Sequence, residues 1–171
     1  MSDLNNGRWA GHISLAHRVI TGWALFGGLV LIAVVLINAY SILAGAIINK
    51  PFPGDFELTE MGVAIAAFCF LPYCQQTGAN VSADIFTMKA GATAIALMKV
   101  LAAIAAVGFS ALLIWRMWFG LLDYIEYEEI TGILSIPLWY AFLPAVFSLV
   151  LLLVAAILTF VDEVAAMRAP R

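Results

Sequence analysis

Charged residues are what this sequence has least of. Aspartate, glutamate, lysine and arginine make up 11% of its 171 residues, whereas hydrophobic residues make up 64%. A soluble domain of this length could not cover its surface with so few charges, but a protein surrounded by lipid needs an apolar exterior. The shortage of charge therefore excludes an ordinary soluble domain and predicts an integral membrane protein.

Cysteine and histidine are also scarce, with two of each. Cys69 and Cys74 are five residues apart, so they point to different sides of a helix and form no reactive CxxC pair. His12 and His17 both precede the first apolar stretch, whereas a haem-binding membrane anchor needs axial histidines inside facing helices. These placements disfavour a membrane redox protein and favour cysteines that only pack.

The motifs of common catalytic sites are missing as well. The sequence contains no Gly-rich phosphate loop, no cluster with metal-ligand spacing and no pairing of a nucleophile with a base. We therefore predict that the chain is not an enzyme. We expect no catalytic residues, no cofactor, no metal site and no nucleic-acid partner.

Four long apolar stretches fill most of the chain. They cover residues 19–48, 58–76, 91–119 and 137–161. A helix rises about 1.5 Å per residue, so about 20 residues cross the roughly 30 Å hydrocarbon core of a bilayer. The sequence thus predicts an all-α integral membrane protein, with four transmembrane helices in one membrane domain over residues 1–171. An interfacial N-terminal segment is expected to lie on the membrane before the chain turns into it.

Most lysines and arginines fall on one side of these spans. That side carries Arg8, Arg18, Lys89, Lys99, Arg168 and Arg171, whereas the first loop has only Lys50 and residues 120–136 have none. Because positive residues accumulate in the cytoplasm, both termini are predicted to be cytoplasmic. Lys99 and Arg116 lie near the two ends of the third span, where we interpret them as interfacial charges whose long side chains reach water.

The acidic residues gather on the opposite side. Seven of the eleven are placed there: Asp55, Glu57, Glu60, Asp123, Glu126, Glu128 and Glu129. One interpretation is a solvated rim that follows from topology. The other is a docking surface for a soluble partner outside the membrane, with Asp123, Glu126, Glu128, Glu129 and Asp55 as its candidate residues.

Small residues mark possible helix contacts. Ala102 and Ala106 in the third span, and Gly62 and Ala66 in the second, form a candidate helix-packing interface, because small residues let helix backbones approach closely in lipid. The pattern fits packing inside the chain as well as packing on a permanent partner. Asn38 and Ser41, polar groups within the first span, are explained by interhelical hydrogen bonds at least as well as by substrate contact.

The combination of these features resembles a known family. Residues 49–87 contain a Pro/Gly turn at Gly54, a helix start with Glu57 and Glu60, a polar Gln-Thr-Gly end to the second span, and Asp84 before the third. An Ile-Pro-Leu-Trp sequence, residues 136–139, precedes the last span. Over nearly its whole length, the chain resembles the small membrane subunit (DctQ-like) of TRAP transporters, the tripartite ATP-independent periplasmic transporters.

The resemblance implies a multi-pass protein of the bacterial inner membrane with two protein partners. A periplasmic binding protein would deliver a small organic anion, such as a carboxylate, and a large multi-span permease subunit would carry it inward with sodium. The small subunit would brace the large one and would hold no catalytic residues. Two other hypotheses stay open: a stand-alone four-helix scaffold or assembly factor, and a membrane redox protein.

Overall fold

The computed structural model describes residues 3–78 and 92–168, which form four long helices. These are α1 (Asp3–Ile48), α2 (Asp55–Thr77), α4 (Ala92–Glu126) and α5 (Trp139–Arg168). Each contains a stretch long and apolar enough to cross a membrane, namely Leu15–Ile48, Asp55–Thr77, Leu97–Glu126 and Trp139–Ala165. The predicted all-α fold with four membrane helices is confirmed.

Three helices extend well beyond the spans expected from the sequence; among them, α5 continues past Val161 to Arg168. α1 is unbroken from Asp3, so the N-terminal segment does not turn into the membrane as a separate piece. No proline interrupts residues 3–18, and a helix is free to continue there. α4 continues past Phe119 to Glu126, because Leu121 still packs in the bundle with 4% of its surface exposed. Asp84, Lys89 and Arg171, which the sequence analysis used, lie outside the described residues.

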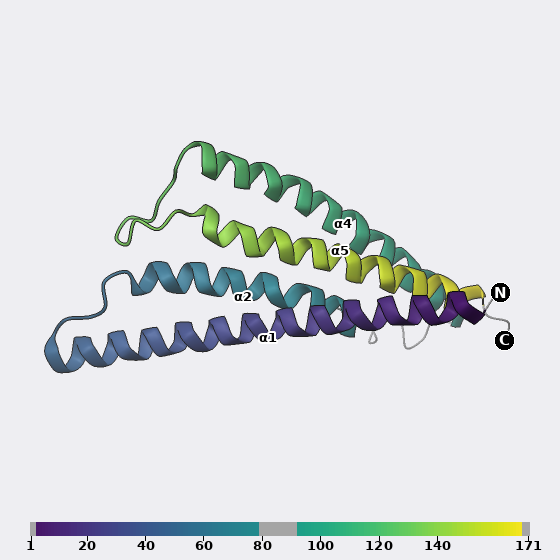
Figure 1. The fold of residues 1–171 in the computed structure, drawn as a ribbon, viewed down its shortest axis with the longest axis horizontal. Coiled ribbons are helices and arrows are strands. Elements are labelled where there is room, and N and C mark those ends of the chain that lie inside the picture. The colour runs from purple at the N-terminus through teal and green to yellow at the C-terminus, as the bar shows by residue number, and fades with distance from the viewer. Residues whose placement is uncertain (1–2, 79–91, 169–171) are drawn as a thin grey trace.

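The helices lie side by side in the order α1, α2, α5, α4 (Figure 1). The first turn of α1 and the last turn of α5 share one end, which we call the termini end. The opposite end, with residues 49–54 and 127–138, is the loop end. The α1–α2 and α4–α5 pairs are antiparallel, whereas the two central helices, α2 and α5, run in the same direction. The pairs diverge towards the loop end (Figure 1).

Glycine brings α1 and α2 close together. A Cβ atom on Gly27 would lie 2.6 Å from the Cβ of Cys69 and 3.3 Å from the backbone oxygen of Ala66, and a Cβ on Gly62 would overlap Val34. Ala66 and Cys69 are fully buried. The small residues of the second span therefore form a close contact within the chain.

A polar group lies where α1, α2 and α5 meet. Ser148 of α5 is fully buried, and its Oγ accepts a 2.8 Å hydrogen bond from the indole Nε1 of Trp23 on α1. The same hydroxyl donates to the backbone oxygen of Pro144 at 2.7 Å and lies 3.9 Å from the Sγ of Cys69. Since its hydrogen-bonding capacity is met, Ser148 joins three helices without an unsatisfied polar group.

Candidate functional site

The second loop at the loop end is fastened to the start of α2. The carboxylate of Glu57 accepts hydrogen bonds from the backbone N–H groups of Ile133, at 2.6 Å, and Leu134, at 2.9 Å. Leu134 also covers Gly54, the N-cap of α2, whose φ of 83° suits glycine. This anchoring role could not be read from the sequence, because an acid in a first helical turn looks like a dipole partner. Glu57 instead accepts hydrogen bonds from the amides of Ile133 and Leu134, which are 76 and 77 residues away in the sequence.

The first loop is held by Asp55, one of the acids singled out for docking. One carboxylate oxygen accepts a 2.5 Å hydrogen bond from Ser41 Oγ, and the other accepts the backbone N–H of Phe56 at 2.8 Å. The Ser41 hydroxyl in turn accepts the N–H of Phe52 at 3.1 Å. The charge of Asp55 is thus used to tie the end of α1 to the start of α2.

The other four docking candidates, Asp123, Glu126, Glu128 and Glu129, are all exposed at the loop end. Among the residues that the structure describes, none of them forms an ion pair with a lysine or arginine. Two hollows adjoin them. One has a volume of about 320 Å³ and is lined by Gly120, Asp123, Tyr124, Tyr127 and Glu129; the other, of about 610 Å³, is lined by Ile125, Glu128, Ile130, Pro137 and Trp139. Asp123 and Glu129 therefore line one of these hollows and Glu128 lines the other, whereas Glu126 lines neither.

Two polar side chains of α1, Asn38 and Ser41, form hydrogen bonds to α2. Asn38 Nδ2 donates to Thr59 Oγ1 at 2.6 Å and to the backbone oxygen of Val34 at 2.9 Å. With the Ser41–Asp55 bond, this gives both polar residues of the first span the interhelical hydrogen bonds expected of them. Sequence reasoning did not identify Thr59, whose own hydroxyl donates to the backbone oxygen of Asp55 at 2.7 Å.

The candidate packing residues divide into two places. Gly62 and Ala66 lie in the α1–α2 contact, whereas Ala102 is exposed on α4 and Ala106 is half-buried there. Between the described helices, α4 packs mainly on α5, and much of its remaining surface is apolar and open. Its exposed large side chains include Leu101, Ile104, Phe109, Leu112, Trp115 and Phe119.

The charged residues of the third span also lie on this exposed helix. Lys99 Nζ is 3.8 Å from Glu163 Oε1 on α5, at the termini end. Arg116 is exposed and lies beside Trp115, nearer the loop end. About 17 residues of helix, roughly 25 Å, separate the two cations. α4 continues ten residues beyond Arg116, to Glu126, and the role of both cations as interfacial charges stays a prediction.

The two cysteines have different surroundings. Cys69 is buried against Gly27 and Ser148, and Cys74 is half-buried; neither forms a disulfide. Within residues 3–78 and 92–168, no group of three or more metal-ligating side chains comes together.

Comparison with known proteins identifies the family. The family model described as "Tripartite ATP-independent periplasmic transporters, DctQ component" matches residues 34–166, which include all of α2 and α4 and most of α5. No curated protein and no solved structure matches the chain. The match covers well over half of the sequence. The chain belongs to the DctQ family, the small membrane subunits of TRAP transporters.

Proposed function

We propose that this chain braces the large permease subunit of a TRAP transporter, without catalysing a reaction itself. The complete system would take up a small organic anion, such as a carboxylate, together with sodium, after a periplasmic binding protein delivers the anion. The protein would lie in the bacterial inner membrane with both termini in the cytoplasm. Its loop end would then face the periplasm.

The observation that carries this proposal is the use of the polar side chains inside the spans. Asn38 bonds to Thr59, and Trp23 bonds to Ser148, so these groups fasten α1 to α2 and to α5. Hydrogen bonds between membrane helices hold them in one arrangement. Such a cross-linked bundle suits a fixed support better than a part that must rearrange around a substrate.

The surface offered to the large subunit is the exposed side of α4. α4 packs mainly on α5 and leaves aromatic and aliphatic side chains such as Leu112 and Trp115 outward. Ala102 and Ala106 belong to the same helix and allow a partner to approach its backbone closely. We therefore place the large subunit against α4, with these two alanines at the edge of the contact.

The periplasmic binding protein would meet the acidic surface at the loop end. Asp123, Glu126, Glu128 and Glu129 are exposed there, and a partner with lysine or arginine residues would be attracted to them. Asp55 and Glu57 have a different role, since Asp55 holds the first loop and Glu57 holds the second loop, which carries Glu128 and Glu129. A negatively charged face would also repel a free anion, which agrees with delivery by a protein.

Reconstitution tests the whole proposal. Liposomes containing this chain alone should show no sodium-driven uptake of labelled organic acids. Adding the large subunit and the loaded binding protein should produce uptake, and leaving out this chain should abolish it. Sodium-driven transport by the chain alone, or full transport without it, would contradict the bracing role. Failure to co-purify with the large subunit would favour a stand-alone scaffold.

A further inference from the structure

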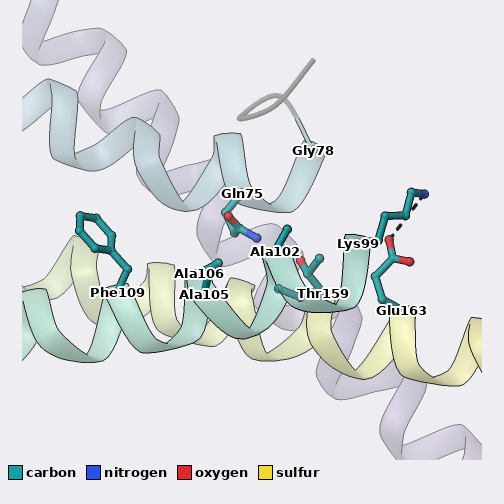
Figure 2. Close-up of a pocket in the computed structure, with 10 residues that line it drawn as sticks. Gln75, Gly78, Lys99, Ala102, Ala105, Ala106, Phe109, Thr159 and Glu163 are labelled. Atoms are coloured by element: carbon teal, nitrogen blue, oxygen red, sulfur yellow. Dashed lines mark ion pairs between the residues drawn. The ribbon is translucent and has the colours of Figure 1, made fainter. Parts of the chain in front are cut away.

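A groove opens between α2 and α4, with α5 at its base (Figure 2). Its volume is about 630 Å³, within the range of roughly 300–1,000 Å³ that is common for ligand sites. The α4 side is built almost entirely from alanine, with Phe109 at one end (Figure 2). The lining residues on α4 fall within Leu97–Glu126, a stretch long and apolar enough to cross a membrane, so in a bilayer the groove would lie at membrane depth.

Polar groups gather at the other end of the groove. Lys99 and Glu163 face each other there across 3.8 Å, and the side chains are 58% and 28% exposed. Gln75, in the last turn of α2, points towards the alanines (Figure 2). All three residues lie towards the termini end of their helices, within two or three turns of the ends of the membrane-spanning stretches, where lipid headgroups are expected. The groove is therefore apolar along its length and carries one cation and one anion at its mouth.

We propose that this groove binds one phospholipid with a zwitterionic, amine-bearing headgroup. One acyl chain would lie along the alanines towards Phe109. The phosphate would contact the ammonium of Lys99, and the headgroup ammonium would contact the carboxylate of Glu163. The lipid would come from the leaflet at the termini end.

The two charges at the mouth are what select this ligand. A long ion pair between an exposed lysine and a partly exposed glutamate contributes little to stability, so Lys99 and Glu163 can separate to receive a headgroup. A purely anionic headgroup would satisfy Lys99 and be repelled by Glu163. A partner's transmembrane helix would fill the apolar part but has no need of opposite charges at one end. This inference requires only that the chain spans a membrane, and it does not depend on the transporter role.

The test counts lipid molecules on the purified chain by native mass spectrometry. The full chain, in mild detergent, is incubated with phosphatidylethanolamine or with phosphatidylglycerol carrying the same acyl chains. One phosphatidylethanolamine should stay bound per chain, in preference to phosphatidylglycerol. Lys99→Gln should lower its retention roughly tenfold, the scale of one lost close contact. Glu163→Gln should remove the preference for phosphatidylethanolamine over phosphatidylglycerol.

Filling the groove provides the second arm. Ala102→Leu with Ala106→Leu should displace the acyl chain, whereas Ala33→Leu with Ala39→Leu, on exposed positions of α1, should not. Arg116→Gln is the matched control for loss of a cation from α4. Circular dichroism checks that each variant is folded. If the leucine variant misfolds, the two charge variants still test the proposal.

Three outcomes would overturn the proposal. Equal retention of the two lipids by the wild-type chain would show non-selective annular lipid. Unchanged lipid counts in both the charge variants and the leucine variant would place the lipid elsewhere. A leucine variant that is folded and keeps its lipid would show that no acyl chain lies along the alanines. Because the lipid count uses the chain alone, it is independent of whether a transporter complex forms.

Discussion

Replacement of Gly27 by alanine should separate α1 from α2. The new Cβ would lie 2.6 Å from the Cβ of Cys69, an atom fixed to the α2 backbone. Carbon atoms pack at about 3.5–4.0 Å, so the helices would have to part by roughly 1 Å at this point. Overpacking of this kind costs about 1–3 kcal/mol.

Gly28→Ala is the matched control. No atom lies within 4 Å of a Cβ at Gly28, so this variant gains helix propensity, about 1 kcal/mol in a soluble helix, without a clash. Gly27→Ala has the same gain together with the overpacking cost. The difference in free energy of unfolding between the two variants therefore isolates the clash, and we expect about 1–3 kcal/mol.

The assay is unfolding of the purified chain by SDS titrated into mild-detergent micelles. Adding Cys69→Gly to Gly27→Ala removes the atom that the new methyl group meets. A double-mutant cycle should then show a coupling of about 0.5–3 kcal/mol in the direction of rescue. Equal stability of Gly27→Ala and Gly28→Ala, or no coupling to Cys69→Gly, would refute the close contact of these helices.

Three further predictions concern the loop end. In a background without Cys69 and Cys74, an impermeant maleimide added outside should label Glu128→Cys but not Lys89→Cys or Arg168→Cys; the reverse labelling would put the acidic surface in the cytoplasm. Changing the four docking acids together to Asn and Gln should reduce uptake at limiting binding protein, and rising salt should weaken wild-type uptake, because exposed charges act mainly on association rate. Equal uptake at every concentration of binding protein would leave these acids as a solvated rim. Glu57→Gln should speed hydrogen exchange at the amides of Ile133 and Leu134, which its carboxylate binds, whereas Glu60→Gln, on an exposed neighbour, should not; identical exchange in the two variants would remove the anchoring role.

The membrane helices could be predicted because the bilayer imposes a length and an apolar composition that are visible in sequence. An interhelical hydrogen bond from Asn38 could also be expected, although its acceptor, Thr59, could not be named from the sequence. The bond from Trp23 to Ser148 could not, since it spans 125 residues and depends on which helices are neighbours. The same reason explains why Gly62 and Ala102 looked alike in sequence. The order of the helices decides that Gly62 lies in an internal contact and that Ala102 lies on an open surface.

The order α1, α2, α5, α4 also bears on how the chain is assembled during synthesis. Each outer helix packs mainly on its antiparallel neighbour, α1 on α2 and α4 on α5, so each half of the chain can form a helical hairpin as it enters the membrane. Membrane helices associate after they have been inserted. The last step is then the docking of the two hairpins, through contacts such as Cys69 with Ser148, which are 79 residues apart. A ribosome would have released most of the chain before that central contact could form.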